Sequence, residues 1–268
     1  NIGEVDNKGI ELSLNWRKEI IKDLNVDLRA NLTYNKNKYV YYDEPNYEAV
    51  WKKKTGQPLS ISWGYIADGY FQNQEEIDNG PDQTGLGSQL KPGDIKYRDV
   101  NGDGIINDDD KVMLSSFGSM PRIQYGLGLN LTYKKIDFGV FFNGSAQRKI
   151  MINNAMTDFG ERNNNVMKCI ADDHWSIDNP NPEATFPRLG LKSTDIKNNT
   201  EASSHWLRNG NFIRFKTLEV GYSFPHCRVY FSGDNLAVWS PFKLWDPELS
   251  WNTYPLQRTF NFGVQLNF

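Results

Sequence analysis

The stretch IQYGLGLNLTYKKIDFGVFFNGSA, residues 123–146, decides the fold class. Up to Tyr133 every second residue is apolar, and the residues between them are polar or glycine. After a pair of lysines the alternation resumes at Ile136 and continues to Phe142. Successive side chains of a β-strand point to opposite faces, so this pattern predicts two strands joined by a tight turn, each with one apolar face.

The same period of two recurs on both sides of this stretch. It is clear in residues 10–16, 24–34, 218–224 and 260–268, and weaker around Val229 and Phe231. The sequence therefore predicts seven strands. Several of them are about 10 to 12 residues long, whereas strands of soluble proteins are usually about 5 to 6.

The predicted connections alternate in length. Three are tight turns, at residues 18–23, 134–135 and 225–226, and three are long, at residues 36–121, 147–211 and 240–257. Compact soluble domains rarely contain unstructured loops beyond about 15 residues. Membrane barrels have short periplasmic turns and long extracellular loops. If Phe268 lies on the periplasmic side, every tight turn falls on that side and every long loop falls outside.

We therefore expect an all-β protein whose antiparallel strands form part of a large transmembrane β-barrel with long extracellular loops. Residues 36–121 form one extracellular excursion, and the strand-like segment 61–72 is an extension or hairpin above the membrane. Aromatic residues near strand ends, such as Tyr133 and Tyr222, suit the aromatic girdles of a membrane barrel. The alternative is a soluble β-sandwich, in which the apolar faces meet a core.

Composition narrows the function classes. The 268 residues carry a net charge of -3, which argues against a nucleic-acid binder. The mean hydropathy is -0.64, and no apolar run reaches the length of a spanning helix. The N-terminus shows no signal peptide. Cys169 and Cys227 permit one disulfide at most, and their pairing stays open.

The acidic stretch 99–110 is the most chemically specific motif. It fits the spacing of a calcium-binding loop, with aspartate and asparagine oxygens at positions 1, 3 and 5 and a glycine at position 6. The alternative is an Asn-Gly/Asp-Gly turn with solvated carboxylates. The predicted calcium ligands are Asp99, Asn101, Asp103, the carbonyl of Ile105, and Asp110 at position 12.

Other chemistry is weakly indicated. No nucleophile elbow, zinc-protease, P-loop or dinucleotide motif is present, so we do not expect an enzyme. The three histidines are scattered and lack partners at metal-ligand spacing. Most tryptophans fall in or near the long connections, where packing between loops is the more frequent role and stacking on sugars or partners is the alternative.

These strands and the acidic loop together resemble the C-terminal portion of SusC/RagA-type TonB-dependent outer-membrane transporters of Bacteroidetes. The terminal Phe268 also matches the family. The resemblance is carried by NIGEVDNKGIELSLNW (1–16), GYIADGYFQNQEE (64–76), KPGDIKYRDVNGDGIINDDDKV (91–112), MPRIQYGLGLNLTYKKIDFGVFFNGSA (120–146), LRNGNFIRFKTLEVGYSF (207–224) and FSGDNL (231–236).

The resemblance implies that residues 1–268 form the C-terminal segment of a 22-stranded barrel whose plug is absent from this chain. It further implies uptake of glycan or peptide across the bacterial outer membrane. TonB would act through the missing N-terminal part, and a SusD-like surface lipoprotein would cap the barrel. Outer-membrane lipid would surround the strands, and Phe268 would be the insertion signal. The alternative function is a soluble surface β-module that binds glycan with a structural calcium.

Overall fold

The computed structural model describes residues 2–153, 165–191, 194–250 and 253–266. The predicted end of the last strand at 267–268 lies outside the described residues. The chain divides into two compact units. The sheet unit comprises residues 6–37, 120–148 and 209–268, and the loop unit comprises residues 1–5, 38–119 and 149–208.

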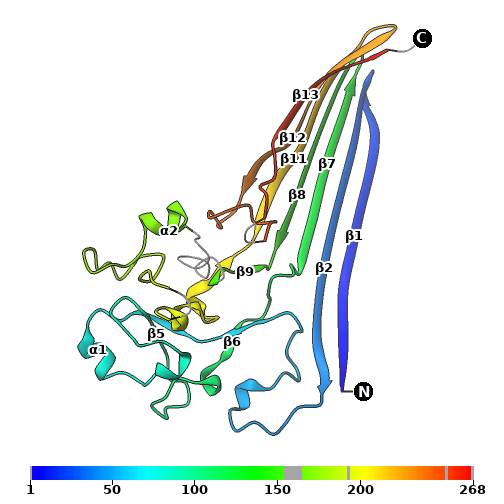
Figure 1. Cartoon of the computed structure of the whole chain (residues 1–268). Coiled ribbons are helices and arrows are strands. Elements are labelled where there is room, and N and C mark those ends of the chain that lie inside the picture. The colour runs from blue at the N-terminus through cyan, green and yellow to red at the C-terminus, as the bar shows by residue number, and fades with distance from the viewer. Residues whose placement is uncertain (1, 154–164, 192–193, 251–252, 267–268) are drawn as a thin grey trace. The chain divides into compact units, whose positions relative to one another are not determined.

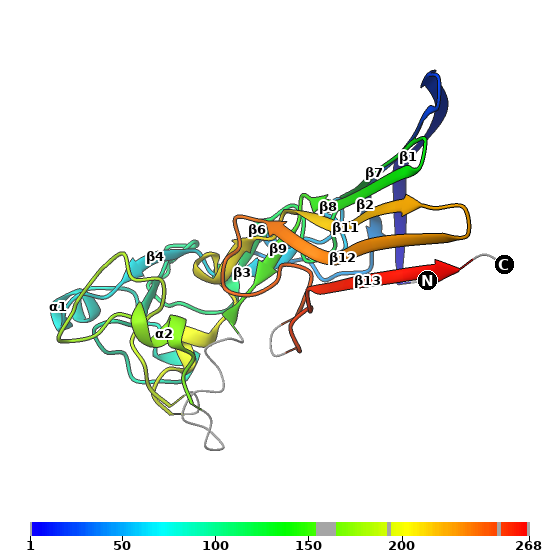
Figure 2. The same ribbon diagram turned by 90° about the horizontal axis from the view of Figure 1, so that it is seen from above.

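The sheet unit is built on one seven-stranded sheet in which the long strands follow one another in chain order (Figure 1 and Figure 2). Each strand pairs with the next long strand, so the sheet is an antiparallel meander. The strands are β1 (Gly3–Ile21), β2 (Leu24–Tyr42), β7 (Ile123–Tyr133), β8 (Ile136–Ala146), β11 (Phe212–Ser223), β12 (Cys227–Trp239) and β13 (Thr259–Leu266). The predicted all-β antiparallel fold is confirmed.

Tight turns join these strands in pairs. β1 and β2 are separated by two residues, as are β7 and β8. Asp23 and Lys134 take positive φ angles of 65° and 54°, the left-handed backbone that lets a two-residue turn follow the twist of its strands. Long connections alternate with these turns, as predicted.

The first two strands are longer than the sequence pattern indicated. β1 continues to Ile21, so the turn predicted at 18–23 shrinks to two residues. β2 continues to Tyr42, so residues 36–42 are strand and not the start of a loop. Lysine and asparagine in NKNK, residues 35–38, hide the period of two, but backbone hydrogen bonding does not depend on it.

The loop unit contains short elements only. Its helices are α1 (Gln74–Asp78) and α2 (Lys168–Asp172), with short 3-10 turns η1 (Val50–Lys52), η2 (Thr84–Leu86), η3 (Asp108–Asp110), η5 (Lys197–Thr200) and η6 (Ser204–Trp206). The small paired strands are β3 (Ser62–Gly64) with β6 (Val112–Ser115), β4 (Ala67–Tyr70) with β5 (Ile95–Tyr97), and β9 (Lys149–Met151) with β10 (Leu207–Asn209). Segment 61–72 thus contributes β3 and β4 and adds no strand to the seven-stranded sheet.

Buried apolar side chains belong almost entirely to the loop unit. Among the described residues, Phe212 and Phe242 are the two buried apolar side chains of the sheet unit. The largest fully buried apolar side chains are Tyr65, Phe71, Ile95, Tyr97, Ile106, Ile152, Ile170, Phe186, Ile196 and Trp206. The loop unit therefore has a hydrophobic core of its own. No helix within the described ranges is both long and apolar enough to cross a membrane.

Candidate functional site

The strand register sorts the side chains of the sheet onto two chemically different faces. Leu28 lies opposite Leu129, and Leu129 lies opposite Val140, so apolar residues meet apolar residues across strands. One position along, Asp27 lies opposite Asn130, and Asn130 lies opposite Gly139. A bulge at Lys216 in β11 lets the same division continue beyond it.

The apolar face is exposed in the sheet unit. Leu12 is 58% exposed, Leu127 47%, Val220 39% and Val264 65%. A β-sandwich would bury such residues against a second sheet, but the sheet unit holds only one large sheet within the described ranges. Aliphatic side chains that stay exposed along whole strands suit hydrocarbon as their solvent.

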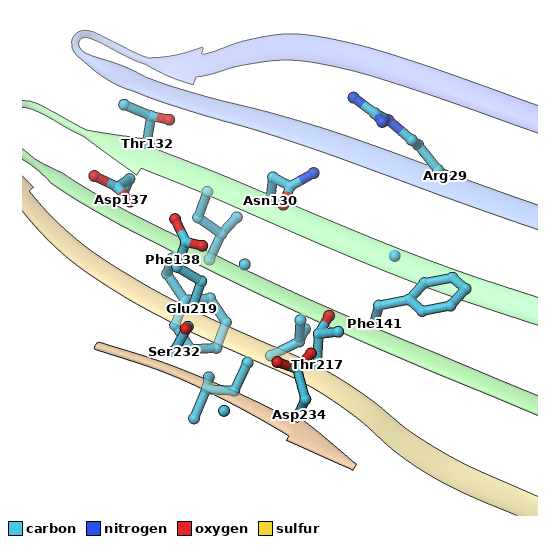
Figure 3. A pocket seen from close by; sticks show the side chains of 16 residues that line it. Arg29, Asn130, Thr132, Asp137, Phe138, Phe141, Thr217, Glu219, Ser232 and Asp234 are labelled. Carbon is cyan, nitrogen blue, oxygen red and sulfur yellow. The ribbon is translucent and has the colours of Figure 1, made fainter. Parts of the chain in front are cut away.

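The polar face is hollowed near its middle. Figure 3 shows Arg29, Asn130, Phe141, Glu219 and Asp234 projecting from successive strands around this hollow, which has a volume of about 580 Å³. A second hollow of about 610 Å³ lies over β1, β2, β7 and β8. Its lining residues include Glu11, Asn31, Gln124 and Asn143. The polar face therefore offers amides, hydroxyls and carboxylates, with Phe141 between the two hollows.

Ion pairs tie neighbouring strands together on the polar face. Arg228 donates to both oxygens of Asp137, with Nε 3.0 Å from Oδ1, and Nη2 lies 2.5 Å from Glu219 Oε1. In the same way, Asp27 accepts hydrogen bonds from Arg17 and Arg29. These opposite charges neutralise one another on the polar face and stabilise the pairing of the strands.

Glycine is needed where these side chains cross a neighbouring strand. A Cβ on Gly221 would lie 2.5 Å from Asp137 Oδ2 and 2.6 Å from Arg228 Nη2. A Cβ on Gly126 would lie 2.9 Å from Asn31 Oδ1 and 3.2 Å from the Phe141 ring. These mid-strand glycines accordingly make room for side chains that cross from a neighbouring strand.

The acidic loop is a tightly hydrogen-bonded turn. Asp99 accepts from the backbone N–H groups of Gly102 and Gly104, at 2.6 and 2.7 Å. The Gly104 bond is the main cause that holds the pKa of Asp99 below its ordinary value. Asp103 accepts from Ile105 N at 2.8 Å and from the Asn101 amide at 2.9 Å. Three of the predicted ligands, Asp99, Asn101 and Asp103, thus lie on one short loop.

Asp110, the fourth predicted side-chain ligand, has a structural role. It is fully buried, and its two oxygens accept from Val100 N at 2.7 Å and Asn107 N at 2.8 Å. These bonds close the loop, so a cation here would depend on Asp99, Asn101, Asp103 and the Ile105 carbonyl. In the described part of the chain, no three His, Cys, Asp or Glu side chains are grouped to hold a metal ion. The calcium site stays a prediction.

The sequence did not predict the buried polar network of the loop unit. Asp94 is fully buried, 2.6 Å from Arg188 Nε, and accepts from Asn199 Nδ2 at 2.8 Å. Burial raises the pKa of Asp94, and the neighbouring Arg188 opposes that rise. Asn199 also accepts from Ile95 N at 2.9 Å. These partners are about a hundred residues apart in sequence, so no local pattern could have revealed the network.

His205 packs inside the same unit. Its ring lies 5.4 Å from the ring of Tyr70 and 4.5 Å from that of Trp206. Its Nε2 lies 3.3 Å from the Tyr70 hydroxyl. Burial lowers the pKa of His205 to about 4, and nearby Arg208 adds to the shift. His205 is therefore a packed, neutral residue at neutral pH.

The tryptophans divide between packing and exposure. Trp206 is fully buried and donates to Asn199 O at 2.8 Å, and Trp175 is buried beside Gly93. Trp239, at the end of β12, is 53% exposed. Both Cys169 and Cys227 are free thiols. The loop-packing role holds for Trp175 and Trp206.

Comparisons with known proteins agree with this geometry. The chain is 30% identical to TonB-dependent receptor P26 of Formosa agariphila and 28% identical to TonB-dependent receptor SusC of Bacteroides thetaiotaomicron. Both matches cover 100% of this chain, but only 30% and 27% of those proteins. No family model matches. The chain thus spans less than a third of the length of the curated relatives that it matches.

A solved structure shows the same fold. The structure of the RagAB peptide transporter matches 100% of this chain and 29% of the compared chain, with a TM-score of 0.70 and 20% sequence identity. TonB-dependent receptors are outer-membrane proteins, which agrees with the predicted location. The 268 residues are therefore similar, over their whole length, to a segment of TonB-dependent receptors, SusC among them.

Proposed function

We propose that this chain is part of the barrel wall of an outer-membrane TonB-dependent importer that takes up glycan or peptide. The observation that carries the proposal is the division of one long-stranded sheet into an exposed apolar face and a hollowed polar face. The apolar face suits lipid, and the polar face suits a water-filled lumen. The match to TonB-dependent receptors, which covers the whole of this chain, supports the same function, and transport is favoured over catalysis.

The substrate class and the partners belong to the same proposal. RagAB is described as a peptide transporter, whereas the resemblance to the SusC/RagA family also allows glycan. The hydroxyl, amide and carboxylate groups around the hollows could accept hydrogen bonds from either. A SusD-like lipoprotein would bind on the extracellular side, and TonB would act through a part of the parent protein outside these residues.

Fractionation of the intact parent protein tests the location. We expect the parent protein in the outer-membrane fraction, because the apolar side chains of the long strands are exposed in the sheet unit. Recovery in the soluble periplasm would contradict the proposal. Uptake is tested by deleting the gene and supplying either labelled glycans or labelled peptides. Loss of uptake of one class identifies the substrate, whereas unchanged uptake of both contradicts an import role.

The alternative function, a soluble glycan-binding β-module, makes the opposite prediction for the isolated chain. Such a module folds in plain buffer, whereas a barrel segment needs detergent or its missing neighbouring strands. Circular dichroism of the isolated chain in buffer and in detergent separates the two. A cooperative thermal transition of the seven-stranded sheet in buffer alone would favour the soluble module.

A further inference from the structure

Arg214 is the most deeply buried charged side chain of the sheet unit. It lies on β11 opposite Asn143 of β8, which places it on the polar face. Its side chain is only 1% exposed. A guanidinium stays charged at any physiological pH, so burial at this level requires ionic and hydrogen-bond partners.

Its ionic partners come from the connection between β12 and β13. Arg214 Nη2 lies 2.6 and 2.7 Å from the two oxygens of Asp246, and Nε lies 2.5 Å from Glu248 Oε2. The remaining terminal nitrogen donates to the side-chain oxygen of Asn235. One strand residue therefore binds two carboxylates that are two positions apart on one loop, each by a charge-assisted bond.

Further contacts hold the same loop against the sheet. Arg148, just after β8, donates to the carbonyl of Pro247. Ser240 Oγ donates to Asn211 O at 2.7 Å, and Phe242 is buried with its ring 4.7 Å from that of Trp245. The charged groups around the contact are thus Arg148, Arg214, Asp246 and Glu248, two of each sign. In contrast, Lys243 on the same loop is exposed.

We propose that residues 240–249 form a strap that folds onto the polar face of the sheet, and that Arg214 is the latch that holds it there. The strap covers the β11–β12 part of the polar face at the end away from the tight turns. It leaves that face only when the two carboxylates separate from Arg214. Because Arg214 is buried, dissolved salt screens this latch little, whereas removal of its charge releases it.

The strap is a property of the sheet unit and does not depend on import. If the polar face lines a lumen, as proposed above, the strap narrows that lumen at its loop end. If import is not the function, the latch still holds residues 240–249 in place. Its test therefore measures the strap directly, without a transport assay.

Hydrogen exchange of the intact parent protein in detergent, followed by mass spectrometry, tests the latch. Arg214→Met removes the positive charge. Arg214→Lys keeps the positive charge but lacks the guanidinium group that bonds Asp246 and Glu248 at the same time. Glu248→Gln removes one of the two carboxylates. We expect backbone amides of residues 242–249 to exchange at least about tenfold faster in Arg214→Met, with smaller increases in the other two variants. Amides of β7 should keep their protection.

Lys243→Met is the matched control, because it removes a positive charge from the strap without touching the latch. Its exchange should equal that of the parent protein. If Arg214→Met disrupts β7 as well, the comparison rests on Arg214→Lys and Glu248→Gln. The proposal is overturned if none of the three latch variants exchanges faster across residues 242–249 than Lys243→Met does.

Discussion

The two units of this chain solve the problem of apolar side chains in opposite ways. The loop unit buries Trp206, Phe186 and Ile196 to 1% exposure or less. The sheet unit leaves Leu12 and Val264 more than half exposed along strands that alternate strictly. Water drives the first arrangement, because burying apolar surface is favourable there. The second is stable only where hydrocarbon or another apolar body covers the strands. The loop unit thus suits water, whereas the apolar face of the sheet unit suits an apolar environment.

The largest expected effect is loss of the core of the loop unit. Trp206→Ala removes a fully buried indole and its hydrogen bond to Asn199, at a cost of about 3–5 kcal/mol. Near-UV circular dichroism of the parent protein in detergent should show an earlier melting transition of the buried aromatic residues. Val50→Ala, at a side chain 66% exposed, is the control with little effect. Equal melting of the two variants would contradict a core that is specific to the loop unit.

A charge on the apolar face should act on the sheet unit instead. Leu129→Arg places a guanidinium toward lipid near the middle of β7, at a cost of about 2–4 kcal/mol in a bilayer. Asn130→Arg, one residue along and on the polar face, is the matched control. Folding in lipid vesicles, measured by the heat-dependent gel shift of the parent barrel, should fall only for Leu129→Arg. If folding falls only for Asn130→Arg, the face that carries Asn130 is the one that meets lipid, and our assignment of the two faces is wrong.

Acid should weaken the loop unit through His205. Its pKa is about 4 in the folded protein and 6.5 in its ordinary state, so the unfolded chain binds the proton more readily between those values. Stability present above pH 6.5 is lost as the pH falls toward 4, by about 2–3 kcal/mol. Near-UV melts at pH 7 and pH 4.5 measure the loss. His205→Gln should show a smaller difference between the two pH values, and an unchanged difference would exclude His205 as the cause.

The smallest expected effect is calcium binding to the acidic loop. Position 12 carries Asp110, whose oxygens already bind backbone N–H groups, so we expect weak binding through the remaining ligands. Isothermal titration calorimetry of the parent protein with calcium measures it. Asp99→Ala and Asp103→Ala should each remove the heat, and Asp108→Ala, outside the predicted ligand set, should not. If the unmodified protein shows no binding heat, the calcium prediction is wrong and the acidic loop is a structural turn.

Much of the sheet could be predicted because its signal is local. The alternation in residues 123–146 is set by neighbours along the chain, and the structure places β7 and β8 at the predicted residues. The ends of β1 and β2 could not be read, because polar residues there stand on both faces. No local sequence pattern predicted the bulge at Lys216, yet this bulge keeps Arg214 and Glu219 on the same face of the sheet.

The sequence by itself therefore determined the antiparallel strands, their two faces and the alternation of short and long connections. These follow from the period of two and from turn residues, which act over a few positions. Only the tertiary structure showed the core of the loop unit, the Asp94 network and the Arg214 latch. Each of them joins residues that are tens of positions or more apart, and such contacts depend on the path of the whole chain and not on any local pattern.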